Sequence, residues 1–395
     1  MPWMQTEPME QRCKFVVAHL AGRESMTELC ERFGVSRRTG YKWLSRYAKA
    51  GFWGLEERSR APHHHPHRVS DAVATVLIRA RERHPRWGPR KIRALVARSN
   101  PSLKLPAPST IGELFRGAGL VKKRRRKLRS EPYGSALGGY DSPNAIWCAD
   151  FKGHFAVGDD RCHPLTISDG FSRYILACQS LRRPLTIHVR KVFEQIFREY
   201  GLPDAIRTDN GPPFSSLSVG GLSALSVWWI KLGIRHERIA PGRPEQNGRH
   251  ERMHATLKAE TASPPRRSFS AQQRAFNTFR EEFNHVRPHE ALGMRTPGEL
   301  YRPSARTIPK TLPDPTYPKD AITLRTQRHG VITFERAQWY VSGCLRNELI
   351  ALTPDREEQW LVHFGPVLLG KIDLNSIGRL KRSTPRTKRY RRRRF

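Results

Sequence analysis

The sequence lacks the features of membrane and secreted proteins. It contains no run of about 18 consecutive apolar residues, which is the length that a membrane-spanning helix needs. The first residues, MPWMQTEPMEQRCKF, include no apolar segment of the kind that a signal peptide requires. We therefore expect a cytoplasmic protein without a membrane partner.

Cysteine is scarce and widely spaced. The six cysteines, at positions 13, 30, 148, 162, 178 and 344, include no C-x-x-C pair, so we expect reduced thiols and neither a disulfide framework nor a zinc site. The run HHHPH at 63–67 suggests metal binding. No spaced cysteine or carboxylate accompanies it, however, and adjacent histidines cannot all face one ion. We interpret residues 56–69 as a linker.

Acidic residues are few relative to basic ones. The chain of 395 residues has 36 Asp and Glu against 71 Lys and Arg, which gives a formal net charge of +35. Such an excess indicates a polyanionic partner. A membrane surface is the alternative partner, but no membrane segment is present, so we predict that the partner is nucleic acid in the form of double-stranded DNA and that the protein is associated with the nucleoid.

The N-terminal residues 1–55 predict a helix-turn-helix DNA-binding domain. Ser25 and Glu28 have the spacing of a capping box, so a helix should begin near Met26, and Gly34 supplies the turn before the next helix. That next helix has a basic outer face, which we predict to lie in the major groove. The candidate DNA contacts are Arg37, Arg38, Tyr41 and Lys42. The alternative is a three-helix packing that binds no DNA.

A second helix-turn-helix domain is predicted over residues 70–121. Helices are expected at 70–83, with Ser70 as the N-cap, at 86–99 and at 109–120. The middle helix is basic, and its candidate DNA contacts are Arg90 and Lys91. Two such modules would allow one protein to bind a longer DNA sequence.

Two segments are too basic to pack into a folded domain. Residues 122–129, KKRRRKLR, are basic at seven positions in eight, and residues 381–395 are basic at nine in fifteen and contain no acid. Blocks of like charge stay extended and bind phosphates without sequence preference. We interpret 122–143 as a basic linker and 381–395 as a disordered tail.

Two acids stand where apolar or turn residues would be expected. Asp150 lies inside the strand-like segment AIWCADFKGHF, and Asp209 ends the short strand-like segment AIRTDNG. A buried carboxylate is costly unless it is paired or holds a metal ion. These acids therefore indicate a cation site, for which oxygen ligands favour Mg²⁺ or Mn²⁺.

A third acid lies on a helix that we expect to begin at Pro244. At 3.6 residues per turn, Asn247, Glu251, His254 and Lys258 share one face, while Met253 and Leu257 form a separate apolar stripe. Charged helix faces are usually only solvated. The two acids upstream favour a face that meets a metal ion and a phosphate group.

These motifs carry a family resemblance. The series Asp150, TDNG at 208–211 and NGRHERMHATLK at 247–258 resembles the Asp-Asp-Glu core of insertion-sequence transposases and retroviral integrases, and residues 279–301 resemble the segment that follows their catalytic helix. The spacing between the last two acids is longer than is most common in that superfamily. The apparent insertion SSLSVGGLSALSVWW at 215–229 accounts for the surplus.

The resemblance implies a ribonuclease H-like α/β catalytic core with a mixed sheet at 144–303. It also implies that Asp150, Asp209 and Glu251 are catalytic and hold two metal ions, with Asp150 bridging them. Lys258 is then our best phosphate contact, and Asn247 and His254 are further candidate DNA contacts. Glu245 competes with Glu251 for the third position, but it lies off the stripe, in a first helical turn where an acid favours the helix dipole.

The region after Pro303 predicts a smaller appended domain. Residues 304–320 are rich in proline and are interpreted as a linker. Short alternating runs over 321–380, such as GVITFERAQWYVSG and QWLVHFG, predict about four strands and a small C-terminal β-barrel-like domain. The domain would help to bind DNA ends or subunits, or it would be a plain structural appendage.

Together these features predict a DNA transposase of an insertion sequence. It would bind element ends and catalyse metal-dependent phosphodiester hydrolysis and strand transfer, as a dimer or larger homo-oligomer on DNA. One alternative is a catalytically silent, transposase-derived DNA-binding regulator. Another is a non-specific nuclease, against which the tandem helix-turn-helix modules argue.

Overall fold

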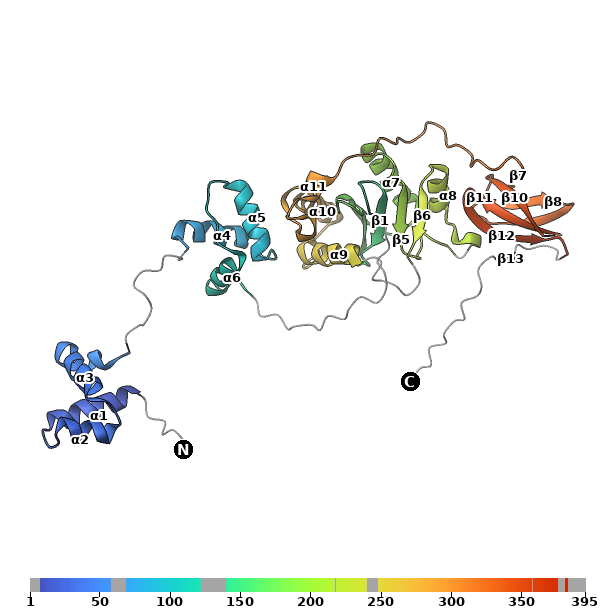
Figure 1. Cartoon of the computed structure of the whole chain (residues 1–395). Coiled ribbons are helices and arrows are strands. Elements are labelled where there is room, and N and C mark those ends of the chain that lie inside the picture. Colours follow the sequence, from blue (N-terminus) through green and yellow to red (C-terminus); the bar gives the residue numbers. More distant parts are fainter. Residues whose placement is uncertain are drawn as a thin grey trace. The chain divides into compact units, whose positions relative to one another are not determined.

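The computed structural model describes residues 8–57, 69–121, 140–216, 218–239, 248–356, 358–375 and 381–382 (Figure 1). The chain divides into two compact units, Met1–Val69 and Ser70–Phe395. No helix in these residues is long and apolar enough to cross a membrane.

The first unit consists of three helices and a short 3₁₀ turn. They are α1 (Pro8–Leu20), α2 (Met26–Phe33), α3 (Arg37–Ala50) and the turn Gly51–Leu55. The capping box of Ser25 and Glu28 is present, and Gly34 adopts the left-handed conformation that ends α2. Phe15 and Val16 of α1 are buried, whereas Leu20 at its end is 62% exposed.

A second group of three helices begins the other unit. α4 (Asp71–Arg83), α5 (Pro89–Ser99) and α6 (Pro108–Gly117) occur at the predicted places, and the Ser70 hydroxyl caps α4 as predicted. Each helix contributes buried apolar side chains, and Trp87 between α4 and α5 is buried as well: Leu77, Trp87, Ile92, Ile111 and Phe115.

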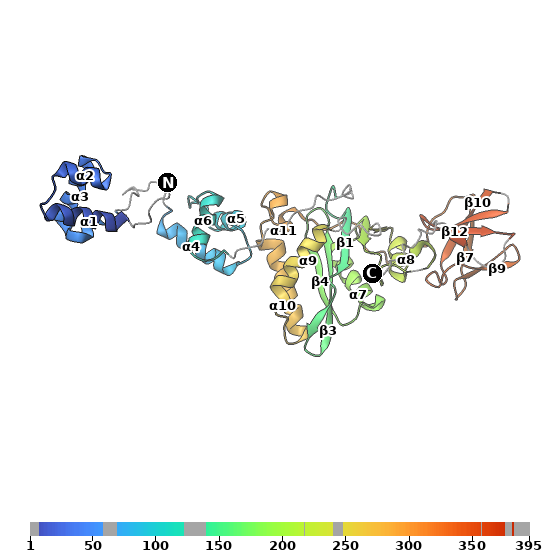
Figure 2. The ribbon, with the colours of Figure 1, turned by 90° about the horizontal axis from the view of Figure 1, so that it is seen from below.

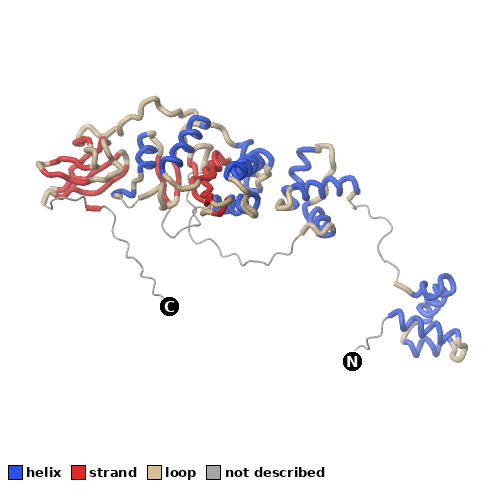
Figure 3. The backbone as a smooth tube through the Cα atoms, turned by 180° about the vertical axis from the view of Figure 1, so that it is seen from behind, coloured by secondary structure: helices blue, strands red, loops and turns tan. Residues whose placement is uncertain are grey.

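Residues 144–303, which we predicted to be the catalytic core and here call the catalytic region, are built on a mixed β-sheet (Figure 3). Its strands are β1 (Ile146–Phe151), β2 (Phe155–Val157), β3 (Asp160–Asp169), β4 (Ile175–Leu181), β5 (Ala205–Thr208) and β6 (Arg235–Arg238). β3 is antiparallel to β1, β2 and β4, whereas β1 with β5 and β5 with β6 are parallel. β1 therefore lies in the interior of the sheet. The strand-like segment AIWCADFKGHF is interrupted between β1 and β2.

Helices cover both faces of this sheet, with α7 on one face and α9 and α10 on the other (Figure 2). These are α7 (Thr186–Tyr200), α8 (Ala224–Lys231), α9 (Gly248–Thr261), α10 (Phe269–Glu281), which continues as a π turn over Glu282–Val286, and the short α11 (Pro297–Leu300). Trp147 and Ala149 of β1 pack into the core shared with α7 and α8. Because side chains alternate along a strand, Asp150 faces the side that carries α9.

The C-terminal region is antiparallel. β7 (Ile322–Arg325), β10 (Leu349–Arg356), β11 (Gln359–Phe364), β12 (Val367–Asp373) and β13 (Lys381–Arg382) form a sheet in the order β13-β12-β11-β10-β7. β8 (Val331–Phe334) and β9 (Ala337–Tyr340) form a separate hairpin. Within the described residues no strand pairing joins β7 to β13, so the expected closed barrel is not observed. Alternation predicts strands but does not fix which strands pair.

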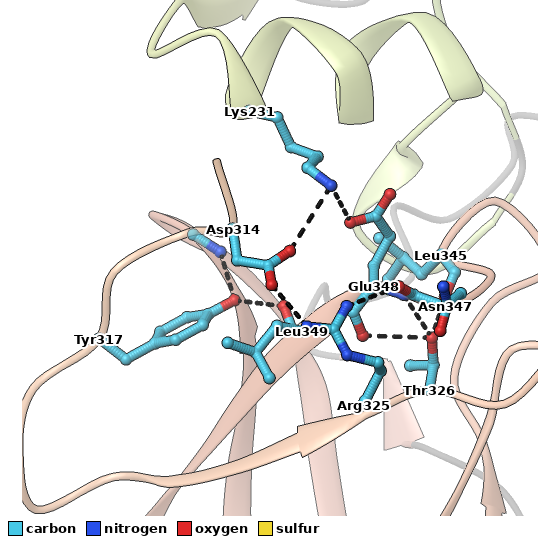
Figure 4. Close-up of polar contacts among 10 residues, drawn as sticks. Lys231, Asp314, Tyr317, Arg325, Thr326, Leu345, Asn347, Glu348 and Leu349 are labelled. Atoms are coloured by element: carbon cyan, nitrogen blue, oxygen red, sulfur yellow. Dashed lines mark hydrogen bonds and ion pairs between the residues drawn. The ribbon is translucent and has the colours of Figure 1, made fainter. Parts of the chain in front are cut away.

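The C-terminal sheet shares a hydrophobic core with α8 of the catalytic region. Leu222 and Val227 are buried together with Trp339, Ile350 and Phe364. Beside this core, Lys231 Nζ lies 2.8 Å from Glu348 and 3.6 Å from Asp314, and Asp314 also pairs with Arg325 (Figure 4).

The segment between the two regions also packs against the catalytic region. The Arg306 guanidinium donates to the backbone oxygens of Pro203, Leu232 and Gly233. The proline-rich stretch that we interpreted as a linker therefore has fixed contacts.

Candidate active site

Asp150 and Asp209 lie at the ends of neighbouring parallel strands. Ala149 of β1 is opposite Thr208 of β5, so each aspartate is the next residue after the last registered pair. Oδ1 of Asp209 accepts a hydrogen bond from the Gly211 amide at 3.2 Å, and the Asn210 side chain donates to the Ile239 carbonyl at 2.7 Å. These bonds hold the Asp209 loop at the edge where β1, β5 and β6 end.

The two carboxylates influence each other electrostatically. Burial first, and then the negative charge of Asp209, raise the pKa of Asp150 to about 7. Glu251 acts in the same direction, while Lys152 acts in the opposite one. Asp209 and Glu251 are therefore both within electrostatic reach of Asp150.

The third acid lies in the first turn of α9. Glu251 is exposed, and so is Lys258 two turns later, while Met253 and Leu257 are buried as expected. Asn247, together with Pro244 and Glu245, lies outside the described residues.

His254 does not lie on the accessible face that we predicted. It is 2% exposed, and its Nε2 lies 2.6 Å from the Thr166 hydroxyl of β3. His250, one turn earlier, is also buried, with its Nε2 2.6 Å from the same hydroxyl. Nδ1 of His254 lies 3.8 Å from Oδ2 of Asp150. His254 therefore packs beneath the carboxylates, where a contact with DNA is prevented.

The donor atoms at this site suit a hard divalent cation. Asp150 and Asp209 place two carboxylates at adjoining strand positions, and carboxylate oxygens are the ligands that Mg²⁺ and Mn²⁺ prefer. The charge of Asp209 is the second cause, after burial, of the raised pKa of Asp150, and a bound cation would offset it. Among the described side chains, no group of three or more His, Cys, Asp or Glu is arranged to hold an ion. The site therefore rests on the two aspartates, with Glu251 in electrostatic reach.

Two lysines line a cavity of about 220 Å³ beside the candidate active site. Lys258 of α9, the predicted phosphate contact, lines it together with Lys152, which follows β1. Lys152 also lowers the pKa of Asp150 and of His254 through its charge. The sequence analysis missed Lys152, although its position two residues after Asp150 was a usable signal.

Sequence reasoning also missed the polar contacts that hold α9 on the sheet. Thr166 is the fully buried partner of both histidines, and it is opposite Asp150 in the β1–β3 register. The spacing of His250 and His254, four residues apart on one helix, was a signal that both lie on the same face. Nothing in the local sequence identifies Thr166 as their partner.

The predicted DNA contacts of the first unit are on the surface of α3. Arg37, Arg38, Tyr41 and Lys42 are exposed, while Gly40 and Trp43 on the other side are buried. The predicted contacts of α5 differ from each other. Arg90 is exposed and lies 3.7 Å from Glu290. Lys91 is half-buried and lines a cavity of about 760 Å³ beside α9.

Four regions of the chain match known domain families. Residues 141–244 and 232–297 match families described as Integrase core domain. Residues 11–63 match the Helix-turn-helix domain family, and residues 39–115 match the Homeodomain-like domain family.

Two bacterial proteins are similar in sequence. The insertion element IS407 uncharacterized 31.7 kDa protein of Burkholderia multivorans is 29% identical over 239 residues, which are 60% of this chain and 82% of that protein. The insertion element IS476 uncharacterized 39.2 kDa protein of Xanthomonas euvesicatoria is 28% identical over 237 residues, covering 60% of this chain and 66% of that protein. The magnesium-bound HTLV-2 integrase catalytic core (trimeric form) aligns with 41% of this chain and 99% of its own, at 20% identity and a TM-score of 0.31.

An integrase core domain that follows helix-turn-helix domains defines a DNA-recombining enzyme of the integrase-like superfamily. Within that superfamily, the integrase core matches and the two insertion-element relatives support an insertion-sequence transposase.

Proposed function

We propose that this transposase cleaves phosphodiester bonds at the ends of its own element and joins the freed 3′ ends to target DNA, using Asp150, Asp209 and Glu251. The observation that carries this proposal is the pair of aspartates at the ends of β1 and β5, with the acid of α9 in electrostatic reach. The net charge of +35 supports a DNA substrate.

In this proposal the three carboxylates hold two divalent ions, Mg²⁺ or Mn²⁺. Asp150 would contact both ions, and Asp209 and Glu251 one each, which is the division of roles that the family resemblance implies. When bound, the ions would neutralise the phosphate oxygens and lower the pKa of an attacking water molecule. Because Asp150 and Asp209 repel each other without a cation, ion binding removes an unfavourable interaction.

The chain's own residues bind and orient the substrate around this site. Lys258 and Lys152 supply positive charge for the phosphates beside the scissile bond. His250 and His254 contact Thr166 and so fix α9, and with it Glu251, on the sheet. No protein nucleophile is required, because water and then a DNA 3′-hydroxyl make the attacks.

The helix-turn-helix domains would bring the enzyme to the element ends. The exposed basic face of α3 would bind there, and joining two ends requires at least two copies of the active site. We therefore propose a homo-oligomer on DNA, a dimer or larger.

The test uses the purified full-length protein, Mg²⁺ and labelled oligonucleotides from the DNA that flanks its own gene. We expect cleavage at one terminal sequence and joining to a second duplex, and we expect Glu251→Gln to reduce both by at least about 10³-fold. Binding without any cleavage would favour the DNA-binding regulator. Cleavage of random duplex at an equal rate would favour the non-specific nuclease.

A further inference from the structure

A second cavity lies beside the catalytic helix. It has a volume of about 760 Å³, and its lining comes from α5, α9, the β3–β4 turn and the segment after the π turn. From α9 it takes Gly248, His250, Arg252, Met253 and Thr256. The three carboxylates of the candidate active site do not line it, so this cavity is distinct from that site.

The cavity is predominantly cationic. Lys91, Arg173, Arg252 and Arg287 line it, against two acids, Asp169 and Glu290. The oxygens of Asp169 already accept hydrogen bonds from the Asn144 amide and from the amide and hydroxyl of Ser172. Glu290 lies 3.7 Å from Arg90 and Arg287 lies 3.1 Å from Glu260, so the positive charge is only partly compensated.

The cationic groups repel one another across this space. Burial first, and then Arg287 and Arg173, lower the pKa of Lys91 to about 8, which Glu290 and Glu260 oppose. Burial first, and then Lys91, Arg287 and Arg173, lower the pKa of His289 to about 3. An anion bound between these groups would attract each of them and so offset their mutual repulsion.

A further feature points to a ligand. His289 is 7% exposed and lines the cavity, and its Nε2 has no hydrogen-bond partner among the described residues. Buried polar atoms are almost always hydrogen-bonded, so an orphan atom in a cavity indicates a missing partner.

We propose that this cavity binds a backbone phosphate of DNA other than the phosphate that is cleaved. The volume accommodates a phosphate with part of its nucleotide. Lysine and arginine are the usual ligands of DNA phosphates, and such contacts position a duplex without reading its sequence. The inference rests on the proposed function, since it takes DNA as the substrate.

The cavity also gives Lys91 a role different from the one that its sequence predicts. As part of a helix-turn-helix domain, it would contact the DNA that this domain binds. In the structure it shares a cavity with the catalytic helix, so it would hold DNA next to the integrase core.

The test measures binding by the full-length protein in EDTA, so that no metal-dependent cleavage takes place. In the first arm, inorganic phosphate should stabilise the wild-type protein against heat, and Lys91→Gln with Arg173→Gln should abolish this stabilisation. Arg173→Lys, which keeps the charge, should retain it. Lys104→Gln removes a positive charge from an exposed position outside the cavity and is the matched control.

The second arm measures the affinity for duplex DNA between about 50 and 200 mM salt. The slope of log K against log salt is negative, and each lost phosphate contact reduces its magnitude by about 0.9. The double variant should therefore reduce the magnitude by about 1, and Lys104→Gln should leave it unchanged. Binding of free phosphate with an unchanged DNA slope would mean that the cavity takes small anions only, which overturns the proposal. Equal slopes for the double variant and Lys104→Gln would overturn it as well. Neither outcome depends on cleavage, so failure here is distinct from failure of the proposed chemistry.

Discussion

Nδ1 of His254 lies 3.8 Å from Oδ2 of Asp150, and its other ring nitrogen lies 2.6 Å from the hydroxyl of Thr166. Thr166 is in turn opposite Asp150 in the β1–β3 register. One buried histidine thus links the helix that carries Glu251 to the strand that carries Asp150, and the geometry of the candidate site depends on this link.

The Thr166 hydroxyl is expected to be important for both stability and activity. Thr166→Val removes the hydroxyl without a large change in volume and leaves two buried imidazoles short of a partner. We expect a loss of about 1–3 kcal/mol in unfolding free energy and slower cleavage, because α9 loses its fixed position. Denaturant unfolding and a cleavage time course measure the two effects. Thr166→Ser keeps the hydroxyl and should behave like wild type, and a Thr166→Val protein with unchanged stability and rate would disprove the link.

Asp150→Asn should abolish cleavage and yet stabilise the metal-free protein. In the folded state the pKa of Asp150 is about 7, above its usual value, so its ionisation opposes folding. This cost grows as pH rises from about 4 to 7 and is constant above that. At pH 8 in EDTA we expect the variant to gain on the order of 1–3 kcal/mol, and the gain should shrink toward pH 5.

Thermal unfolding at these two pH values measures the effect of Asp150→Asn. Asp159→Asn, which changes an exposed loop acid, is the control and should alter neither stability nor cleavage. Addition of Mg²⁺ should raise the unfolding temperature of the wild type and not that of Asp150→Asn. An equal shift for both proteins would remove Asp150 from the metal site.

Two glutamates compete for the third position, and they are separable by substitution. Glu251→Gln should eliminate cleavage while leaving DNA binding intact, because it removes a charge that the ions need. Glu245→Gln should retain cleavage within about threefold, since its predicted role is a favourable interaction with the helix dipole. Single-turnover cleavage of a labelled element end distinguishes them. The reverse pattern would assign Glu245 to the site.

The exposed face of α3 predicts how the first unit binds. Arg38→Ala with Lys42→Ala should weaken binding to the element end at least tenfold more than binding to random duplex, because contacts in the major groove carry sequence preference. Lys49→Ala, in the last turn of the same helix, is the matched control. Binding assays at moderate salt measure both proteins, and an unchanged preference would exclude α3 as the recognition helix.

Anion binding in the cavity beside α9 should depend on pH through Lys91. With a pKa of about 8, Lys91 is charged at pH 7 and largely neutral at pH 9. Arg173 and Arg287 disfavour the charged form of Lys91, whereas Glu260 and Glu290 favour it, and His289 faces Lys91 in the same cavity. Because Lys91 loses its charge between pH 7 and 9, the affinity for sulfate, whose own charge is constant there, should fall over that range. Calorimetric titration measures it, and Lys91→Gln should bind sulfate weakly and without this pH dependence.

Much of the fold was predictable because its signals are local. Ser25, Ser36 and Ser70 begin helices where the sequence places them, since a cap depends only on residues a few positions away. Asp150 and Asp209 stood out because an acid within or at the end of an apolar strand is unusual. The turn after β3 is local as well, since the carboxylate of Asp169 accepts a hydrogen bond from the Ser172 amide three residues on.

The remaining features depend on partners far away in the sequence. Helical spacing placed His254 near Glu251, but Thr166, which makes its side of the helix the buried one, lies 88 residues away. The composition of residues 304–320 is that of a spacer, and only the folded chain brings Arg306 to the carbonyls of Leu232 and Gly233. The cavity lined by Lys91 and Arg173 likewise joins regions that no motif connects.

The shared core of α8 and the C-terminal sheet has a practical consequence for work with fragments. Leu222 and Val227 are 3% and 5% exposed only because the C-terminal strands cover them. A polypeptide that stops after Pro303 would expose this apolar surface to water, and its molecules would aggregate. A fragment that contains the catalytic region should therefore extend at least to the end of β12 at Asp373 to stay in solution.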